Sequence, residues 1–280
     1  MILLVESGAT KGDWRVIAKD GTEMRRLITE GTNVSTMNMD TIRHIISETC
    51  KEFSKEKISE IYFYTAGVVT EDISRQLTET FQGIFPNADC DIQNDLTAAA
   101  RAVCGHSTGI TAILGTGSNS CLFNGEQIIQ RVYSCGYILG DEGSAATLGK
   151  LFIADFLKGL IPEHIAKDFA SRYDCDYATI VEKVYRSKES PSGYLGSFAP
   201  FILKHYNDAY IQDLVDGNFR AFIRRSLKQY DTDTYPVGVV GGFGYALKDI
   251  FEKVAKEEGV KVSGFIKTPI DGLVKYHLGK

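Results

Sequence analysis

The stretch ILLVESGATKGDWRVIAKDG, residues 2–21, decides how the fold begins. A short apolar run leads into small residues around a lysine, and the second half alternates and ends on a Lys-Asp-Gly turn. This pattern predicts a β-hairpin with a tip of small residues. The next segment, TEMRRLITE (residues 22–30), predicts a third strand.

The segments that follow alternate between helical and strand patterns. Apolar spacing predicts helices over residues 40–53, 71–85 and 94–103, a buried strand over residues 58–67 and a further strand over residues 88–93. A second stretch, ITAILGTGSNSCLFNGEQIIQRVY (residues 110–133), then repeats the strand, small-residue turn and strand of the opening. The recurrence predicts an α/β protein made of two similar domains, each with a mixed sheet, and a cleft between them.

The predicted domains span residues 1–106 and 107–280. Helical spacing between about 143 and 230 predicts a helical insertion in the second domain. Residues 235–259 return to strand, glycine turn and helix, residues 260–266 predict a late strand, and residues 269–278 a last short helix that packs back on the first domain.

Composition narrows the class of function. The chain has 31 Lys and Arg residues against 36 Asp and Glu residues, without a long run of either sign, which argues against a nucleic-acid or membrane-surface partner. No secretory signal or transmembrane segment is recognisable, so we expect a soluble, cytoplasmic protein. Its six cysteines lack C-x-x-C spacing and are expected to be reduced and mostly buried.

Two tips of small residues, S-G-A-T and G-T-G-S-N, could hold phosphate oxygens against backbone N–H groups. Each tip alone is more often an ordinary turn, but two equivalent tips could hold a nucleotide from both sides. Thr10 or Lys11 would then add a hydroxyl or a charge, and Glu6 could reach a magnesium ion through its water shell. No G-x-x-x-x-G-K-[ST] motif is present.

A third glycine turn occurs in GVVGGFGYAL, residues 238–247. Gly241, Gly242 and Gly244 could support a nucleoside or could serve close packing of a helix on a strand.

Three carboxylates precede predicted helices. Asp95 could cap its helix, or it could accept a proton from an attacking hydroxyl. Asp141 and Glu142, in CGYILGDEGSAA, could likewise be caps or could bind sugar hydroxyls through several hydrogen bonds.

The set ESGATK, TNVS, TAGV, NDLTAAARA, LGTGSN, CGYILGDEGSA and GVVGGFGYAL, in this order, closely resembles the N-acetylglucosamine kinase family. That family belongs to the BadF/BadG group of the actin, sugar kinase and Hsp70 superfamily. The most specific part is LGTGSN followed by GDEGSA. The resemblance implies two actin-like (ribonuclease H-like) domains and ATP-dependent phosphorylation of the 6-hydroxyl of N-acetylglucosamine or a related amino sugar, with Mg²⁺.

Residue roles follow from the resemblance by position. Asp95 would be the base that activates the sugar hydroxyl, and Glu6 would orient the hydrated magnesium. The residues around the sugar would be Asn33, Gly67, Ser118, Asn119, Gly136, Tyr137, Asp141 and Glu142. The residues at the nucleotide would be Ser7, Gly8, Thr10, Lys11, Gly115, Thr116, Gly117, Gly241, Gly242 and Gly244.

Two positions depart from the family pattern. The family usually has aspartate where Glu6 stands, and Tyr137 is only a rough counterpart of a tryptophan near the acetyl group. Two alternative functions stay open: an ATPase that activates an iron–sulfur dehydratase or reductase, and a non-catalytic sugar or nucleotide sensor. The expected partners are a small sugar and ATP, with a homodimer as one expected assembly.

Overall fold

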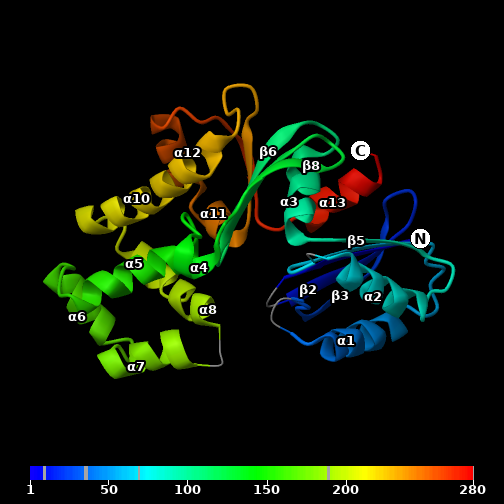
Figure 1. Cartoon of the computed structure of the whole chain (residues 1–280), viewed down its shortest axis with the longest axis horizontal. Helices are drawn as coiled ribbons and strands as arrows, with labels where there is room; N and C mark the ends of the chain where they lie inside the picture. The colour runs from blue at the N-terminus through cyan, green and yellow to red at the C-terminus, as the bar shows by residue number, and fades with distance from the viewer. Residues whose placement is uncertain (9–10, 35–36, 69, 188–189, 280) are drawn as a thin grey trace. The chain divides into compact units, whose positions relative to one another are not determined.

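The computed structural model describes residues 1–8, 11–34, 37–68, 70–187 and 190–279. Over these residues the chain divides into two compact units (Figure 1). Unit 1 comprises Met1–Ser107, Phe123–Ile128 and Thr268–Lys280, and unit 2 comprises Thr108–Leu122 and Ile129–Lys267. Each unit has a five-stranded sheet with helices, which confirms the predicted α/β class.

The sheet of unit 1 has the strand order β3-β2-β1-β4-β5. The central strand β1 (Ile2–Ser7) pairs antiparallel with β2 (Lys11–Ile17) and parallel with β4 (Glu60–Thr65). The outer strands are β3 (Glu23–Glu30), antiparallel to β2, and β5 (Asp89–Gln93), parallel to β4. The sheet is therefore mixed, and its three parallel strands end at one edge.

Helices cover both faces of this sheet, which explains the uninterrupted apolar run in β1. Leu3 and Val5 belong to the apolar core formed with α1 (Met39–Lys51) and α2 (Glu71–Gln82). The alternate residues Ile2 and Leu4 lie in a second core, formed with helices on the opposite face. Those helices are α3 (Asp95–Cys104) and α13 (Ile270–His277).

The last helix packs closely on α3. A Cβ on Gly272 of α13 would lie 2.4 Å from the carbonyl oxygen of Ala102, so only glycine permits this approach. Beside it, the buried Arg15 of β2 donates a hydrogen bond from Nη1 to Asp271 Oδ1 at 2.7 Å. The C-terminal helix is thus an integral part of unit 1.

The sheet of unit 2 has the order β10-β9-β6-β7-β8. Strand β9 (Val237–Val240) pairs parallel with both β6 (Gly109–Leu114) and β10 (Val262–Ile266). Three residues join β6 to its neighbour β7 (Ser118–Phe123), and a connection this short requires an antiparallel hairpin. The remaining edge strand is β8 (Ile128–Val132).

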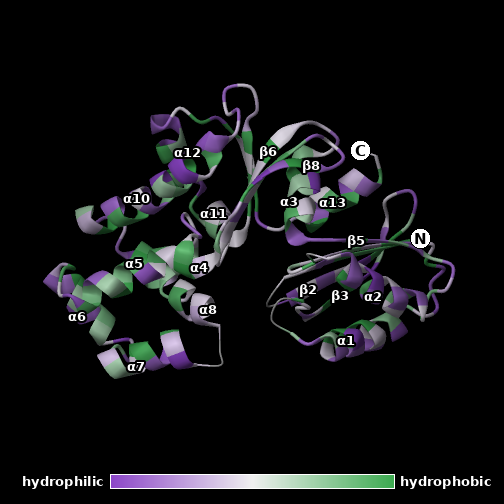
Figure 2. Ribbon diagram, in the orientation of Figure 1, coloured by the Kyte–Doolittle hydropathy of each residue, from purple (hydrophilic) through white to green (hydrophobic). Residues whose placement is uncertain are grey.

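A run of helices separates β8 from β9, as the helical spacing predicts. They are α4 (Gly136–Leu139), α5 (Ala145–Leu157), α6 (Glu163–Ala170), α7 (Tyr177–Val181), a π-helical segment (Glu182–Arg186), α8 (Pro191–Gly196), α9 (Ala199–Lys204), α10 (Ala209–Arg225) and a 3₁₀ turn (Leu227–Gln229). After β9 come α11 (Gly242–Ala246) and α12 (Lys248–Glu257). Figure 2 shows both polar and apolar residues along α10 and α12, as expected for helices with one face in a core.

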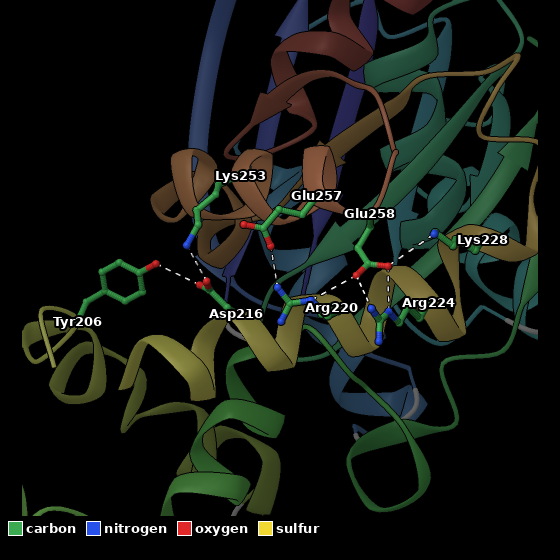
Figure 3. A network of polar contacts seen from close by, with 8 residues as sticks. All are labelled: Tyr206, Asp216, Arg220, Arg224, Lys228, Lys253, Glu257 and Glu258. Carbon is green, nitrogen blue, oxygen red and sulfur yellow. Dashed lines mark hydrogen bonds and ion pairs between the residues drawn. The ribbon is translucent and has the colours of Figure 1, made fainter. Parts of the chain in front are cut away.

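The polar faces of α10 and α12 are joined by ion pairs (Figure 3). Glu258, just after α12, accepts hydrogen bonds from Nε and Nη2 of Arg224 at 2.9 and 2.7 Å. Arg220 contacts both Glu257 and Glu258, and Lys253 donates to Asp216 at 2.9 Å. These contacts hold α12 beside α10, and Asn218 of α10 bonds to the loop at Gly143 and Ser144.

The cysteines correct one expectation. All six are free, but only Cys50 and Cys121 are buried, whereas Cys135 is exposed and the other three are partly buried. The prediction that most are buried is therefore wrong, since several lie near the ends of elements where cover is incomplete. Among the described residues, no helix combines the length and the apolar character needed to cross a lipid bilayer.

Candidate active site

A buried hydroxyl holds the opening hairpin next to its tip. Ser7 and Gly12 pair across β1 and β2, and the Gly8 amide donates to the Lys11 carbonyl at 3.0 Å. The Ser7 hydroxyl is buried and accepts hydrogen bonds from the amide and the hydroxyl of Thr32 at 2.9 and 2.8 Å. Thr10, assigned to the phosphates from the sequence, lies outside the described residues.

The parallel strands of unit 1 bring several predicted residues to one edge of the sheet. Ser7 pairs with Thr65 at the ends of β1 and β4. Beyond these ends, the Val34 amide donates to the Ala66 carbonyl at 3.0 Å, which joins the loop that contains Asn33 to the turn at Gly67. Gly67 has a φ of 88°, which favours glycine.

Asp95 follows β5 at the same edge of unit 1, as the first residue of α3. The N-cap is Asn94, whose Oδ1 accepts the Thr97 amide at 2.8 Å. Asp95 is therefore not the capping side chain, and its Oδ1 instead accepts the Leu96 amide at 3.0 Å. The start of a helix stabilises its negative charge.

Two further carboxylates, those of Glu6 and Asp13, place negative charge near this edge of the sheet. Burial raises the pKa of Glu6 to about 7, and the charges of Asp13 and Asp95 add to the rise, while Lys11 opposes it. Among the described residues, no group donates a hydrogen bond to the Glu6 carboxylate. Glu6 thus lies in a region where negative charge exceeds positive charge.

Asp13, the residue opposite Glu6 in β2, was not assigned a role from the sequence. Its Oδ2 accepts hydrogen bonds from Nη2 of Arg26 at 2.6 Å and of Arg15 at 3.2 Å. Burial alone would raise the pKa of Asp13, but these guanidinium groups hold it below its ordinary value. Asp13 therefore stays ionised beside Glu6. Its place opposite Glu6 in the predicted hairpin was the signal that could have identified it.

In unit 2 the turn between β6 and β7 is closed by Asp141. The Gly115 amide donates to the Gly117 carbonyl at 2.9 Å, and the Ser118 amide donates to Asp141 Oδ1 at 3.2 Å. Asp141 has a φ of 55°, a conformation that few residues other than glycine adopt. Burial raises the pKa of its carboxyl, which the Ser118 amide and Lys150 partly offset.

The loop that carries Asp141 is held by a buried amide side chain from α10. Asn218 Oδ1 accepts the Gly143 amide at 2.9 Å, and its Nδ2 donates to the Ser144 carbonyl at 3.1 Å. Ser144 caps α5, and the next two amides of that helix donate to the carbonyls of Gly115 and Thr116 at 3.0 Å. The phosphate-type turn and the predicted sugar loop are therefore one hydrogen-bonded structure.

The other predicted sugar residues of unit 2 lie around this loop. Glu142 forms an ion pair with Arg225 of α10 at 2.9 Å, which sequence reasoning missed. Lys150 donates to the Tyr137 carbonyl at 2.6 Å, and Gly136 has a φ of 68°. Asn119, in β7, accepts the Ser120 amide through Oδ1 at 3.0 Å.

The glycines in the turn after β9 differ in the space around them, which bears on the two alternatives of close packing and nucleoside support. A Cβ on Gly241 would lie 2.4 Å from the Leu114 carbonyl oxygen, and one on Gly244 would lie 2.9 Å from the Leu114 Cβ. These two glycines therefore serve close packing. A Cβ on Gly242 would meet nothing within 4 Å, so this position has free space beside it.

The residues of unit 1 suit a magnesium ion that keeps several of its waters, not a metal enclosed by protein ligands. The described residues contain no group of three His, Cys, Asp or Glu side chains arranged for a metal. Magnesium commonly keeps several waters and needs only one or two protein carboxylates. The raised pKa of Glu6 and its unused carboxylate oxygens indicate that a cation there would be stabilised.

Solved structures similar to the chain cover almost its whole length. A provisionally assigned N-acetylglucosamine kinase from Porphyromonas gingivalis is 36% identical, with a TM-score of 0.92, over 100% of this chain and 99% of that chain. Another such protein, from Chromobacterium violaceum, is 17% identical, with a TM-score of 0.77, over 98% of each chain.

A ROK-family glucokinase from Streptomyces griseus, in complex with glucose and AMPPNP, is 15% identical, with a TM-score of 0.56, over 98% of this chain and 97% of that one. The last two likenesses show the fold alone. No protein-family model and no curated protein matches the chain. The 36% identity over its full length shows that the chain belongs to the N-acetylglucosamine kinase family of sugar kinases.

Proposed function

We propose that the protein transfers the γ-phosphoryl group of ATP to the 6-hydroxyl of N-acetylglucosamine or a closely related amino sugar. Family membership supports the sugar kinase class. The structural observation that carries the proposal is the position of Asp95, at the edge where the parallel strands of unit 1 end and near enough to Glu6 to raise its pKa. Ligands of open α/β sheets bind at this edge.

Asp95 is the proton acceptor in this proposal. Its carboxylate takes the proton of the sugar hydroxyl while that oxygen bonds to the γ-phosphorus, and the bond to the oxygen that bridges to ADP breaks. The N-terminus of α3 favours the negative charge of Asp95, and the charged carboxylate is the form that accepts a proton. Because Asn94 caps the helix, the Asp95 carboxylate is not needed as the cap.

Asp141 would orient the sugar. Its Oδ1 is already fixed by the Ser118 amide, so its remaining acceptor sites can bind sugar hydroxyls in a defined direction. Glu142, fixed by Arg225, would bind beside it. The other residues proposed at the sugar are Asn33, Gly67, Ser118, Asn119, Gly136 and Tyr137.

The two glycine turns would bind the phosphates. In unit 2 the Gly115 amide is used within the turn, so Thr116 and Gly117 would supply the donors. In unit 1 we assign the tip from Ser7 to Lys11, with the Ser7 hydroxyl serving structure rather than phosphate. Gly242 would lie along the adenosine, with Gly241 and Gly244 fixing the turn that presents it.

Glu6 would hold magnesium through a bound water. Magnesium supplies positive charge that stabilises the phosphate oxygens during transfer. Glu6 is one methylene longer than the aspartate usual in the family, and a contact through water tolerates that difference in reach. Glu6→Asp should therefore keep kcat within roughly tenfold, whereas Glu6→Ala should sharply raise the magnesium concentration needed for half-maximal activity.

ADP release with MgATP and a panel of sugars tests the proposal: N-acetylglucosamine, N-acetylmannosamine, N-acetylmuramic acid, glucosamine and glucose. We expect the highest kcat/KM with an N-acetylated amino sugar. Nucleotide and sugar binding without ADP release would instead support the sensor. The visible absorbance of a cluster in anaerobically purified protein, with sugar-independent ATP hydrolysis, would support the iron–sulfur activator.

A further inference from the structure

The helical insertion of unit 2 contains a cavity of about 600 Å³. It shares Tyr137 with the residues proposed at the sugar, and its other lining residues have no part in the proposed reaction. It lies between α5, α7 and the π-helical segment, with α4 and α8 completing the wall. Most of its lining is apolar: Ile138, Ile153, Ala154, Leu157, Ile180, Val181, Val184 and Leu195. Its volume lies within the range of small-molecule sites, roughly 300–1,000 Å³.

The charged groups of the wall have one sign. Among the described residues, the charged side chains that line the cavity are Lys150 and Lys158, and no carboxylate lines it. Lys150 is committed to the Tyr137 carbonyl at 2.6 Å. Lys158, the exposed residue that ends α5, has no ion pair or hydrogen bond from its side chain to a described residue.

The rim of the cavity is apolar and exposed. Tyr177 and Tyr185 are 71% and 80% exposed, and Ile138 is 70% exposed. Tyr185 belongs to the π-helical segment, a conformation that occurs often at functional sites. Water therefore reaches a large apolar surface, and the charged side chains among its described lining residues are both lysines.

We propose that this cavity binds an amphipathic anion, a molecule with an apolar body and one carboxylate. The body lies against the apolar wall from α5 and the π-helical segment, and the carboxylate pairs with Lys158. The two lysines are eight residues apart on α5, about 12 Å at 1.5 Å per residue, so an extended medium-length acyl chain spans the wall. Apart from Tyr137, the residues that would contact this ligand are not those proposed for the kinase reaction.

Three ligands with the same chain and different head groups test the charge preference: octanoate, 1-octanol and octylammonium. Isothermal titration of the full-length protein should give one octanoate site. We expect octylammonium to bind at least tenfold more weakly than octanoate. Octylammonium binding as tight as that of octanoate, or no octanoate binding at millimolar concentration, would overturn the proposal.

Variants locate the site. Lys158→Met keeps the apolar stem and should weaken octanoate binding about two- to fivefold, the range of a single exposed ion pair, without weakening octanol. Lys167→Met, on α6 and outside the lining, is the matched control and should change neither. Ala154→Phe fills the cavity and should abolish binding of both ligands. Unchanged octanoate binding in a folded Ala154→Phe protein would place the ligand elsewhere and contradict the proposal.

Discussion

The Asp141 carboxylate accepts a hydrogen bond from the Ser118 amide at 3.2 Å, although the two residues are 23 positions apart in the chain. This contact joins the turn after β6 to the loop before α5. It fixes Oδ1 of Asp141 and leaves Oδ2 to accept hydrogen bonds from a ligand. Gly117 lies against the same carboxylate, at a distance that excludes a larger side chain without movement.

Gly117→Ala should therefore weaken sugar binding. The new Cβ would lie 3.1 Å from Asp141 Oδ2, so the carboxylate must shift and its contacts to the sugar must lengthen. Losing a hydrogen bond to a charged group corresponds to about 1.5–3 kcal/mol, so we expect the KM for the sugar to rise about ten- to hundredfold. Gly217→Ala, a helix position with free space, is the control. An unchanged KM in Gly117→Ala would mean that Asp141 does not bind the sugar.

Asn218→Leu should destabilise the loop that carries Asp141. It leaves the Gly143 amide and the Ser144 carbonyl without their buried partner. Each unsatisfied buried group costs about 1–3 kcal/mol, which urea unfolding would detect as a lower midpoint. Where the protein remains folded, the KM for the sugar should rise more than the KM for ATP. Equal changes in both, at unchanged stability, would contradict this positioning role.

Glu6 should make stability depend on pH in an unusual direction. Its pKa is about 7 in the folded protein, above the ordinary 4.5, so ionising it opposes folding. This penalty is absent below about pH 4.5 and is complete above pH 7. Glu6→Gln should thus raise the free energy of unfolding by about 3 kcal/mol at pH 8.5, a gain that shrinks as the pH falls towards 4.5. If the free energies of unfolding of the two proteins depend on pH in the same way, the pKa of Glu6 is not raised.

Glu258 should matter more for stability than its neighbour Glu257. Glu258 contacts three cations, Arg220, Arg224 and Lys228, and its side chain is 8% exposed, whereas Glu257 forms an ion pair with Arg220 and is 45% exposed. Glu258→Gln should therefore lower the Tm more than Glu257→Gln, and salt should reduce the difference. Equal Tm values at low salt would contradict the importance of the network in Figure 3.

The strands and most helices could be predicted because their patterns are local. The apolar run Ile2–Val5 and the alternation in residues 13–17 suffice for the hairpin, and the same pattern recurs after residue 109. The α10 helix was placed only within a helical block and not as a separate helix. Two buried polar residues, Asp216 and Asn218, interrupt its apolar stripe. Their burial is possible because they bond to groups far away in the sequence, which the local pattern does not reveal.

The site was predictable where backbone shape requires a residue type and less so where distant groups meet. Glycines at 117 and 241 could be singled out in sequence, but whether they serve packing or a ligand depends on Asp141 and Leu114. Arg225 and Asn218 gave no signal, since their partners lie about 75 or more residues away. The sequence allowed Asp95 to cap its helix, but the neighbouring Asn94 takes that position, and both residue types favour it.

Steady-state kinetics of one variant and its control decide whether Asp95 accepts the proton of the sugar hydroxyl. Asp95→Asn leaves the Asn94 cap in place, so with N-acetylglucosamine and MgATP it should lower kcat by about 10²–10⁴-fold while the KM for the sugar stays within a fewfold. Asn94→Ala is the matched control: it should reduce stability by about 1 kcal/mol and leave kcat much less affected. A near-normal kcat for Asp95→Asn, in a protein that still binds both substrates, would contradict the account.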